Sequence, residues 1–578
     1  MAQKNLQKYF SRPQNPRQKL YEAIRAIVVD EREYKDVSRQ YGYKVSSLYS
    51  YIQKAKNGVI ELFPELPTKA RGRSAAAQEV REQIINYRKK EHLSAAEISI
   101  KLDKKISAKT VERLLKEAGF SKLKKRTHKE RGITSKNKLI PEVSSKLDFE
   151  NMLPVRIDCP VVGIYFFIPY LLELGIIDII KQCELPGSSV ISNVSACLSM
   201  LALKLIGHER LGTMDNYDAE PGLGFFAGLS LLPKATYMCT YSCRTSEQML
   251  LNFQKQLLQK FMTEQPELYG GDCINLDFHS IPHYGTESEM EKVWCGAKHQ
   301  ALKGANTVFA QDNKNNMVLY TRVDILRKEE TLEVKKFVDY YKSITKEVTE
   351  TLVFDCKFTS YEILNDLATD NIHFVTLRKR NAKLLENVKN IPKDHWVKMN
   401  LNIPKRKHKK IKIYEQEIKL TNCTKPFRQI IVKDHGRDKP TFVITNNKNL
   451  SAKDILMIYA KRWRIENKIS ELVTFFNLNA LSSPLMIRIH FDLLWTLIAD
   501  TLYHRFAQDL RRFEHHDAKT IFRKFINMPG QIIYDGENFT IKIRKRSHTP
   551  ILKSVEKLTN NFTVPWLDNK KVNVIWAA

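Results

Sequence analysis

The chain has 578 residues, too many for one hydrophobic core, so several domains are expected. A formal net charge of +30 favours a polyanionic partner, nucleic acid first, and no basic amphipathic anchor or lipidation signal points to a membrane. Nine scattered cysteines without a metal-binding or disulfide pattern, and an N-terminus without a signal-peptide core, predict free thiols in a reducing cytoplasm.

The N-terminal region, residues 1–66, is predicted to be a helix-turn-helix domain. Amphipathic segments at 19–28, 34–41 and 46–56 are expected helices, with Gly42 in the turn and Ser46 as the last N-cap. An ordinary three-helix bundle would show the same pattern, but the basic charge favours DNA binding. The residues expected to face a major groove are Ser47, Tyr49, Ser50, Gln53 and Lys54.

Residues 67–140 are interpreted as basic linkers around a second helix-turn-helix unit. Ser94 and Glu97 form a capping-box pattern, and residues 107–119 are predicted to be a capped helix closed by a glycine. Arg71 and Arg73 in the first linker would suit a minor groove, although a solvated tether fits equally well. The candidate contacts of the second unit are Lys109, Thr110 and Arg113.

Residues 141–270 are predicted to be a helical supporting region without chemistry of its own. The run at 161–180 has the length of a membrane span. Pro169, Glu173 and Asp178 fall inside it, and charges are costly in a bilayer, so we expect buried core helices instead.

Residues 271–380 show the alternation of an α/β domain. Short apolar strands are predicted at 273–278, 305–311, 317–323, 350–355 and 373–378, with helices at 330–344 and 361–369. The predicted elements thus follow the order of a ribonuclease-H-like fold, which is three strands, a helix, a strand, a helix and a strand. Asp277 lies near the end of the first strand and Asp355 at the end of the fourth.

Residues 381–440 interrupt this order and are predicted to be a β-rich insertion. A basic run at 404–410 includes Lys405 and Arg406, which would contact DNA or form a solvated hairpin turn. Residues 441–528 complete the catalytic core with C-terminal helices. A hairpin around Asp535 and Gly536, followed by a tail, is expected in 529–578.

One predicted helix, starting at Ser451, carries three polar groups on one face. Tyr459, Arg462 and Glu466 lie at i, i+3 and i+7, which brings a phenol, a guanidinium and a carboxylate together. A surface helix with a routine Arg462–Glu466 pair has the same spacing. The two upstream aspartates favour a site for metal and phosphate.

Three motifs stand out: LDFHSIPHYG at 276–285, VFDCKFTSY at 353–361 and Y-x-x-R-x-x-x-E at 459–466. Together they resemble the motifs of a DDE transposase of a bacterial or archaeal insertion sequence, and the resemblance covers roughly residues 150–510. The resemblance implies a multidomain α/β protein, with helix-turn-helix units before a ribonuclease-H-like catalytic domain that a β-rich insertion interrupts. Two departures stand out. Val473 replaces a lysine often found in the family, with Lys468 the nearest, and His279 lies in an unusual sequence after the first acid.

The resemblance implies metal-dependent DNA cleavage, followed by transfer of the freed 3′-hydroxyl to target DNA. Asp277, Asp355 and Glu466 would hold two Mg²⁺ ions, for which Mn²⁺ would substitute, because carboxylates are hard ligands. Arg462 and Tyr459 would position a phosphate, with core packing an equal alternative for Tyr459. The implied partner is double-stranded DNA, both transposon ends and target, bound by a homodimer in a prokaryotic cytoplasm at the nucleoid.

Two other functions remain open from the sequence. One is a tandem helix-turn-helix regulator with an inactive ribonuclease-H-like domain. The other is a ribonuclease-H-like nuclease without strand transfer. Only a transposase predicts terminal inverted repeats flanking its gene.

Overall fold

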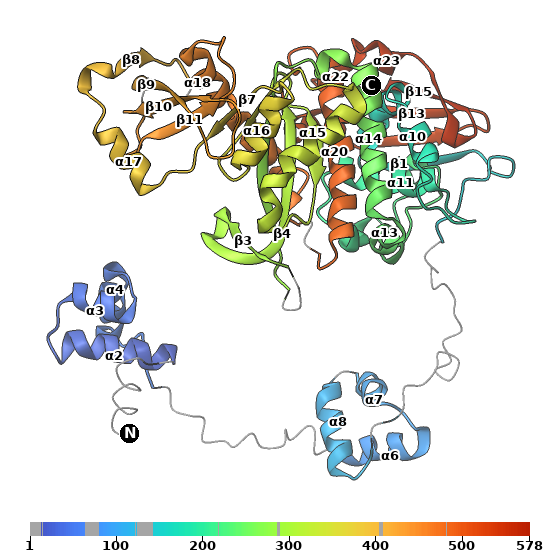
Figure 1. Ribbon diagram of the computed structural model, residues 1–578. Coiled ribbons are helices and arrows are strands. Elements are labelled where there is room, and N and C mark those ends of the chain that lie inside the picture. Colours follow the sequence, from blue (N-terminus) through green and yellow to red (C-terminus); the bar gives the residue numbers. More distant parts are fainter. Residues whose placement is uncertain are drawn as a thin grey trace. The chain divides into compact units, whose positions relative to one another are not determined.

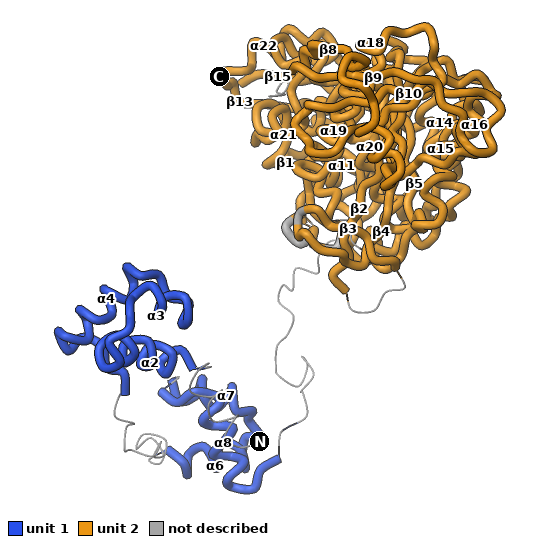
Figure 2. Tube along the Cα trace, turned by 60° about the vertical axis from the view of Figure 1, so that its left-hand side comes forward, with its two compact units in different colours: residues 1–138 blue, residues 139–578 orange. Residues whose placement is uncertain are grey.

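The computed structural model describes residues 13, 15–63, 80–103, 105–121, 123, 143–217, 219–285, 290–403, 409–480 and 483–577. The chain divides into two compact units, residues 1–138 and residues 139–578 (Figure 2). In its described residues the first unit is helical, whereas the second combines helices and strands. The mixed α/β class predicted from the sequence is confirmed.

The first unit contains two small helical groups, each with its own apolar core (Figure 1). Gly42 has a φ of 65° and ends the second helix, as the turn requires. The predicted capping box is present, since Ser94 N–H donates to Glu97 Oε2 (2.6 Å) and Glu97 N–H donates to Ser94 Oγ (3.3 Å). The helices are α2 (Pro16–Val28), α3 (Tyr34–Tyr41), α4 (Val45–Lys56), α6 (Arg81–Glu91), α7 (Ala95–Lys101) and α8 (Ala108–Glu117).

The predicted cap of α4 is wrong. This helix begins at Val45, one residue before Ser46, and its N-cap is Lys44, which makes no side-chain capping bond. Ser46 therefore already lies in the first turn, where its hydroxyl cannot act as the N-cap.

The second unit is built on a ten-stranded sheet in the order β3-β4-β2-β6-β7-β11-β10-β9-β8, with β5 also paired to β4. β2 is antiparallel to β4 and parallel to β6, and β6 is parallel to β7. Five strands, β5-β4-β2-β6-β7, form the ribonuclease-H-like part in the predicted chain order. The bounds are β2 (Cys273–Pro282), β3 (Lys292–Cys295), β4 (Gln300–Asp312), β5 (Val318–Arg322), α15 (Glu333–Thr345), β6 (Thr351–Phe354), α16 (Tyr361–Thr369) and β7 (Phe374–Leu377).

The β-rich insertion extends this sheet. β11 pairs with β7, and β10, β9 and β8 continue outward from it. Each face has an apolar cluster, one that includes Ile455 and Leu456 of α18 and one that includes Leu384 and Val388 of α17. The bounds are α17 (Ala382–Lys389), β8 (Val397–Asn400), β9 (Lys410–Ile418), β10 (Phe427–Lys433), β11 (Thr441–Thr445) and α18 (Ala452–Lys461).

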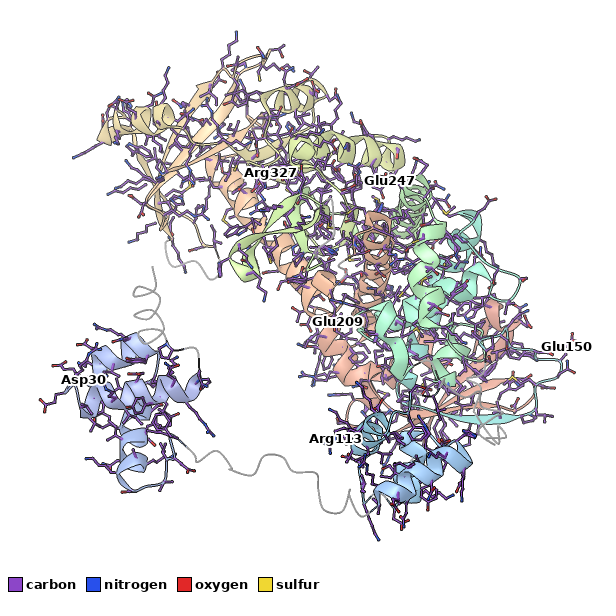
Figure 3. The ribbon with its side chains drawn as sticks, turned by 90° about the horizontal axis from the view of Figure 1, so that it is seen from below. Asp30, Arg113, Glu150, Glu209, Glu247 and Arg327 are labelled. Carbon is purple, nitrogen blue, oxygen red and sulfur yellow. The ribbon has the colours of Figure 1, made fainter. Side chains whose placement is uncertain are left out.

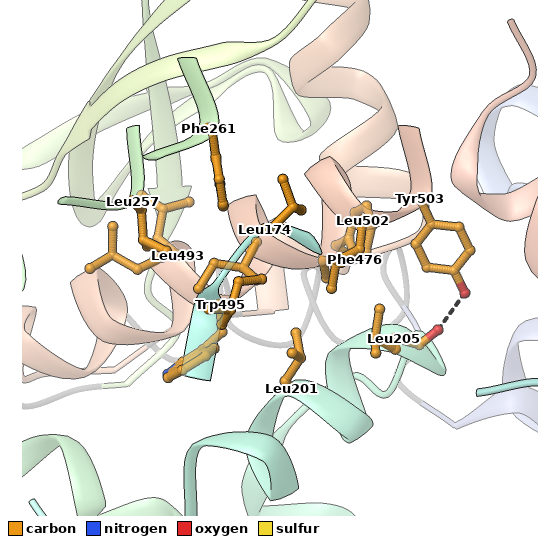
Figure 4. Close-up of a cluster of buried hydrophobic side chains, with 14 of the residues drawn as sticks. Leu174, Leu201, Leu205, Leu257, Phe261, Phe476, Leu493, Trp495, Leu502 and Tyr503 are labelled. Atoms are coloured by element: carbon orange, nitrogen blue, oxygen red, sulfur yellow. Dashed lines mark hydrogen bonds between the residues drawn. The ribbon is translucent and has the colours of Figure 1, made fainter. Parts of the chain in front are cut away.

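Helices around the sheet share one large core. Figure 4 shows Leu205 of α11, Phe261 of α14 and Trp495 of α20 among its buried side chains, and the Tyr503 hydroxyl of α20 donates to the Leu205 carbonyl. This core is the scaffold that holds the sheet and the later helices together. The bounds are α9 (Ile168–Glu173), α10 (Ile176–Gln182), α11 (Asn193–Leu205), α12 (Pro221–Phe226), α13 (Ala235–Tyr241), α14 (Glu247–Glu264), α19 (Trp463–Thr474) and α20 (Met486–Asp509).

The apolar run at 161–180 is buried in this core. No single described helix is long and apolar enough to cross a membrane. In the part of the chain that the structure describes, one pair bent by 64°, Val162–Glu173 with Ile176–Gln182, meets the requirements of length and composition together.

A second sheet joins distant parts of the chain in the order β1-β12-β13-β15-β14. β1 pairs with β12, and the C-terminal tail supplies the last two strands. The tail is therefore structured, although its sequence shows no clear pattern. The bounds are β1 (Val155–Cys159), α21 (Ala518–Ile521), β12 (Gly530–Tyr534), β13 (Phe539–Arg544), α22 (Thr549–Lys553), α23 (Glu556–Thr559), β14 (Phe562–Val564) and β15 (Lys570–Ala577).

Candidate active site

The two aspartates meet because their strands are parallel neighbours. In the register of β2 and β6, Leu276 pairs with Phe354, and each aspartate is the next residue along its chain. This is the last pair in the register, so Asp277 and Asp355 lie side by side where the pairing of β2 with β6 ends. Asp277 is not near the end of its strand, where the sequence predicted it, because β2 continues to Pro282 beside β4. The Asp355 carboxylate accepts a hydrogen bond from Lys357 N–H at Oδ1 (2.7 Å).

Glu466 reaches the same place from α19, which packs against β2. The predicted single helix is in fact two helices, α18 and α19, that meet at Arg462. Hydrogen bonds at the junction span three residues, from Arg462 N–H to Tyr459 O and from Ile465 N–H to Arg462 O (both 3.1 Å). A tighter turn therefore replaces the regular α-helical bonding there.

Contacts with β4 and with the turn after it accompany this break. The Arg464 guanidinium donates to Asn313 O (2.5 Å), and Gln311 Nε2 donates to Arg464 O (3.4 Å). These bonds tie the first turn of α19 to the sheet, so tertiary contacts override the continuous helical pattern of the sequence.

The Arg462 guanidinium bridges two of the three acids. Nη1 lies 2.9 Å from Asp277 Oδ2, and Nη2 lies 2.6 Å from Glu466 Oε1. Burial disfavours the charged guanidinium, but these two carboxylates together hold the pKa of Arg462 above its ordinary value. The structure thus brings the predicted arginine into direct contact with predicted metal ligands.

The electrostatics of this cluster fit a divalent cation. Burial raises the pKa of Asp277, the charges of Asp355 and Glu466 raise it further, and only Arg462 lowers it. Three carboxylates from three elements are also the hard oxygen donors that Mg²⁺ and Mn²⁺ prefer. The residues present are therefore suited to hold such ions.

Tyr459 and His279 both make contacts that are typical of structural residues. Tyr459 packs partly against the apolar cluster of the insertion, and its pKa is raised to about 12, chiefly by burial and also by Asp355, with Arg462 opposing. The His279 ring bonds Asn479 Oδ1 (2.7 Å), and burial lowers the His279 pKa. His279 thus has a structural partner, as an isolated histidine beside a site usually does.

Lys468 does not replace the lysine missing at position 473. Its buried ammonium lies 2.9 Å and 3.0 Å from the two Asp500 oxygens, 3.1 Å from Glu471 Oε2 and 2.9 Å from His504 Nε2. Among the described residues, Glu471, Asp500 and His504 have ligand atoms within 4.8 Å of one another, but the ammonium already contacts all three. This cluster is an internal ion pair that joins α19 to α20.

The predicted DNA contacts of the first unit are largely exposed. Tyr49, Gln53 and Lys54 are exposed on α4, and Ser47 is half-buried. The Tyr49 ring also stacks on Tyr34, with the ring centroids 4.0 Å apart.

On α8, Lys109 and Arg113 are exposed, and Figure 3 labels Arg113. Thr110 is half-buried, and its hydroxyl contacts Ser107 Oγ (2.9 Å). Arg71, Arg73, Lys405 and Arg406 lie outside the described residues.

Sequence reasoning missed one pocket of about 330 Å³ beside α19. Trp463, Arg464 and Asn467 form one wall, Lys314 and Asn316 another, and His515 and His516 a third. The pocket could not be predicted from the sequence, because its walls come from three separate segments. Trp463 and Arg464, inside the motif at 459–466, are the lining residues that a local pattern singles out.

Comparison with known proteins identifies the domain. Residues 269–502 match the family model described as the transposase DDE domain. This part of the chain is a DDE transposase domain. Because it contains this domain, the protein is a DDE transposase, which is a metal-dependent phosphoryltransferase. The matched residues include all three acids and the whole insertion between the last two.

Solved structures similar to this DDE transposase include a piggyBac transposase synaptic complex with hairpin DNA. It is 11% identical, with 66% of this chain and 81% of that chain covered and a TM-score of 0.34. A Mos1 transposase paired-end complex with the left transposon end is 10% identical, covering 62% and 77%, with a TM-score of 0.14. Identities and TM-scores this low carry no functional argument. A search of curated proteins found no match.

Proposed function

We propose that this DDE transposase acts on the terminal inverted repeats of its own insertion sequence. It hydrolyses a DNA strand at the element's end and then transfers the freed 3′-hydroxyl to target DNA. The observation that carries the proposal is the grouping of Asp277, Asp355 and Glu466 within the matched domain, with Arg462 bridging Asp277 and Glu466.

We assign the three acids as the metal ligands of this reaction. Two bound Mg²⁺ ions, or Mn²⁺ in their place, would supply charge stabilisation for the attacking and leaving oxygens. Asp277 and Asp355 present carboxylates from the rigid sheet, and Glu466 presents its own from α19. Arg462 suits a DNA phosphate because its planar fork offers two parallel donors. Tyr459 lies beside it and would help to orient the same phosphate.

The first unit is proposed to recognise the element's ends. Its two helical groups expose Gln53 and Lys54 on α4 and Lys109 and Arg113 on α8, which suits tandem helix-turn-helix contacts. The net charge of +30 supports binding along a duplex. Arg71, Arg73, Lys405 and Arg406 remain proposed backbone contacts.

Cutting two ends in one reaction favours a homodimer that holds both ends together. We propose such a dimer for this protein, in a prokaryotic cytoplasm and at the nucleoid when DNA is bound.

The test is cleavage of a labelled duplex taken from the DNA that flanks the gene. Wild type and Glu466→Gln are compared in Mg²⁺ and in EDTA, with the exposed Glu362→Gln as a matched control. We expect Mg²⁺-dependent cleavage and joining by wild type and Glu362→Gln, and neither by Glu466→Gln. Cleavage by Glu466→Gln at the wild-type rate would show that another carboxylate acts.

Two further outcomes would favour the other functions. Specific binding without cleavage by the wild type would favour a DNA-binding regulator. Cleavage without any joined product would favour a nuclease that lacks strand transfer.

A further inference from the structure

Arg462 occupies the same carboxylates that the proposed metal site needs. Its two terminal nitrogens contact Asp277 Oδ2 and Glu466 Oε1. The other Asp277 oxygen, Oδ1, accepts a hydrogen bond from Phe278 N–H (2.9 Å). Both oxygens of Asp277 are therefore engaged in the protein alone, and Glu466 is held by the same guanidinium.

A divalent cation would compete with this arrangement. The guanidinium is always charged at accessible pH, so it and a metal ion bound to the same carboxylates would repel each other at short range. The Arg462 and Asp277 side chains are 15% and 18% exposed, so solvent screens this repulsion weakly at Asp277. The Glu466 side chain is 54% exposed, so screening there is stronger and the competition centres on Asp277. In the protein alone, Arg462 should therefore weaken metal binding.

We propose that Arg462 couples metal binding to DNA binding, an inference that rests on the proposed function. A DNA phosphate offers the guanidinium a second anion with matching two-pronged geometry. When Arg462 turns to that phosphate, Asp277 and Glu466 become free for metal ions. The site thus assembles fully only on DNA. Because binding free energies are linked, metal ions raise the affinity for DNA by the same factor.

The position of Arg462 in the chain is compatible with such a change of partner. It lies at the junction of α18 and α19, where the hydrogen bonds are already those of a tight turn. Its side chain holds α19 to β2 only through Asp277, whereas Arg464 and Ile465 contribute separate contacts between α19 and the rest of the unit. Arg462 can leave the carboxylates while these contacts remain.

The test is Ca²⁺ binding by isothermal titration calorimetry, with and without a saturating duplex of the element's end. Arg462→Gln removes the guanidinium, and Arg462→Lys keeps a charge without the fork. Lys461→Gln, at the exposed neighbouring position, removes the same charge outside the site. Thermal melting of every variant checks folding.

For wild type and Lys461→Gln, we expect DNA to raise Ca²⁺ affinity by about 10-fold or more, within the usual range of allosteric coupling. Without DNA, Arg462→Gln should bind Ca²⁺ about 10-fold more tightly than wild type, and DNA should then add less than about 3-fold. Arg462→Lys should lie between them.

The coupling is refuted if Arg462→Gln binds Ca²⁺ no more tightly than wild type without DNA, while DNA still strengthens binding in both. That result leaves the proposed function intact. If Arg462→Gln does not fold, a full DNA effect in Arg462→Lys refutes the coupling instead. Absence of Ca²⁺ binding by wild type in both conditions would overturn the proposed function together with the coupling.

Discussion

Removal of the buried Lys468 ammonium should cost this protein much of its stability. The side chain is 1% exposed, that of Asp500 is 2% exposed, and four polar atoms surround the ammonium within 3.1 Å. Lys468→Met would leave the carboxylates of Asp500 and Glu471 facing each other without the cation. Breaking a buried ion pair in this way costs about 3–5 kcal/mol.

The assay is urea unfolding followed by tryptophan fluorescence. All six tryptophans lie in residues 139–578, so the signal reports on the unit that contains Lys468. Lys461→Met, at an exposed position seven residues earlier, is the matched control and should change the free energy of unfolding by less than about 0.5 kcal/mol.

The pH dependence of the destabilisation by Lys468→Met tests whether unpaired carboxylates cause it. Burial raises the pKa of Asp500 to about 6 even with the Lys468 ammonium opposing, so removal of the ammonium should raise it further. A buried acid whose pKa is raised on folding destabilises the folded state while it is charged. Below its folded pKa it is protonated and neutral, so this destabilisation disappears. The destabilisation by Lys468→Met should therefore shrink between about pH 8 and about pH 5. A loss below about 1 kcal/mol, or one that grows on acidification, would refute the reasoning.

Three further outcomes follow from other parts of the molecule. Asp277→Asn should abolish Mg²⁺-dependent cleavage but leave DNA affinity within about 2-fold in gel shifts run in EDTA, because affinity without metal rests on phosphate contacts. Lys54→Gln should weaken end binding and reduce the slope of log affinity against log salt by about 0.9, and an unchanged slope would remove Lys54 from the interface. Gly163→Ala should destabilise by about 1–3 kcal/mol, since a Cβ there would lie 2.4 Å from Ile526 O. Gly296→Ala, with nothing within 4 Å of its Cβ, should be neutral in the same unfolding assay.

The ribonuclease-H-like order could be predicted because its signals are local. A short apolar run precedes each aspartate, at the start of β2 and over the whole of β6, and the connections between elements limit how the strands can pair. Parallel pairing of these two runs then brings Asp277 and Asp355 side by side without further information. The helical spacing of Arg462 and Glu466 likewise predicts their contact, which the structure shows at 2.6 Å.

Other features depend on residues distant in sequence. The break of the helix at Arg462 accompanies contacts with Asn313 and Gln311, which no helical pattern reveals. Pairing of β1 with β12, across more than 370 residues, and the two strands of the C-terminal tail also lack a local signal. The first residue of a helix is also hard to predict to within one position. Helix α4 begins at Val45, one residue before Ser46, which the sequence predicted as its N-cap.

Sequence alone thus determined the type of chemistry, because the acids, their strands and their helical spacing are properties of short segments. Only the tertiary structure decided which charges meet. It buries Lys468 against Asp500 and turns Arg462 onto Asp277, 185 residues away along the chain. The energy of a charge depends on burial and on its nearest partners, and both are set by the packing of distant segments.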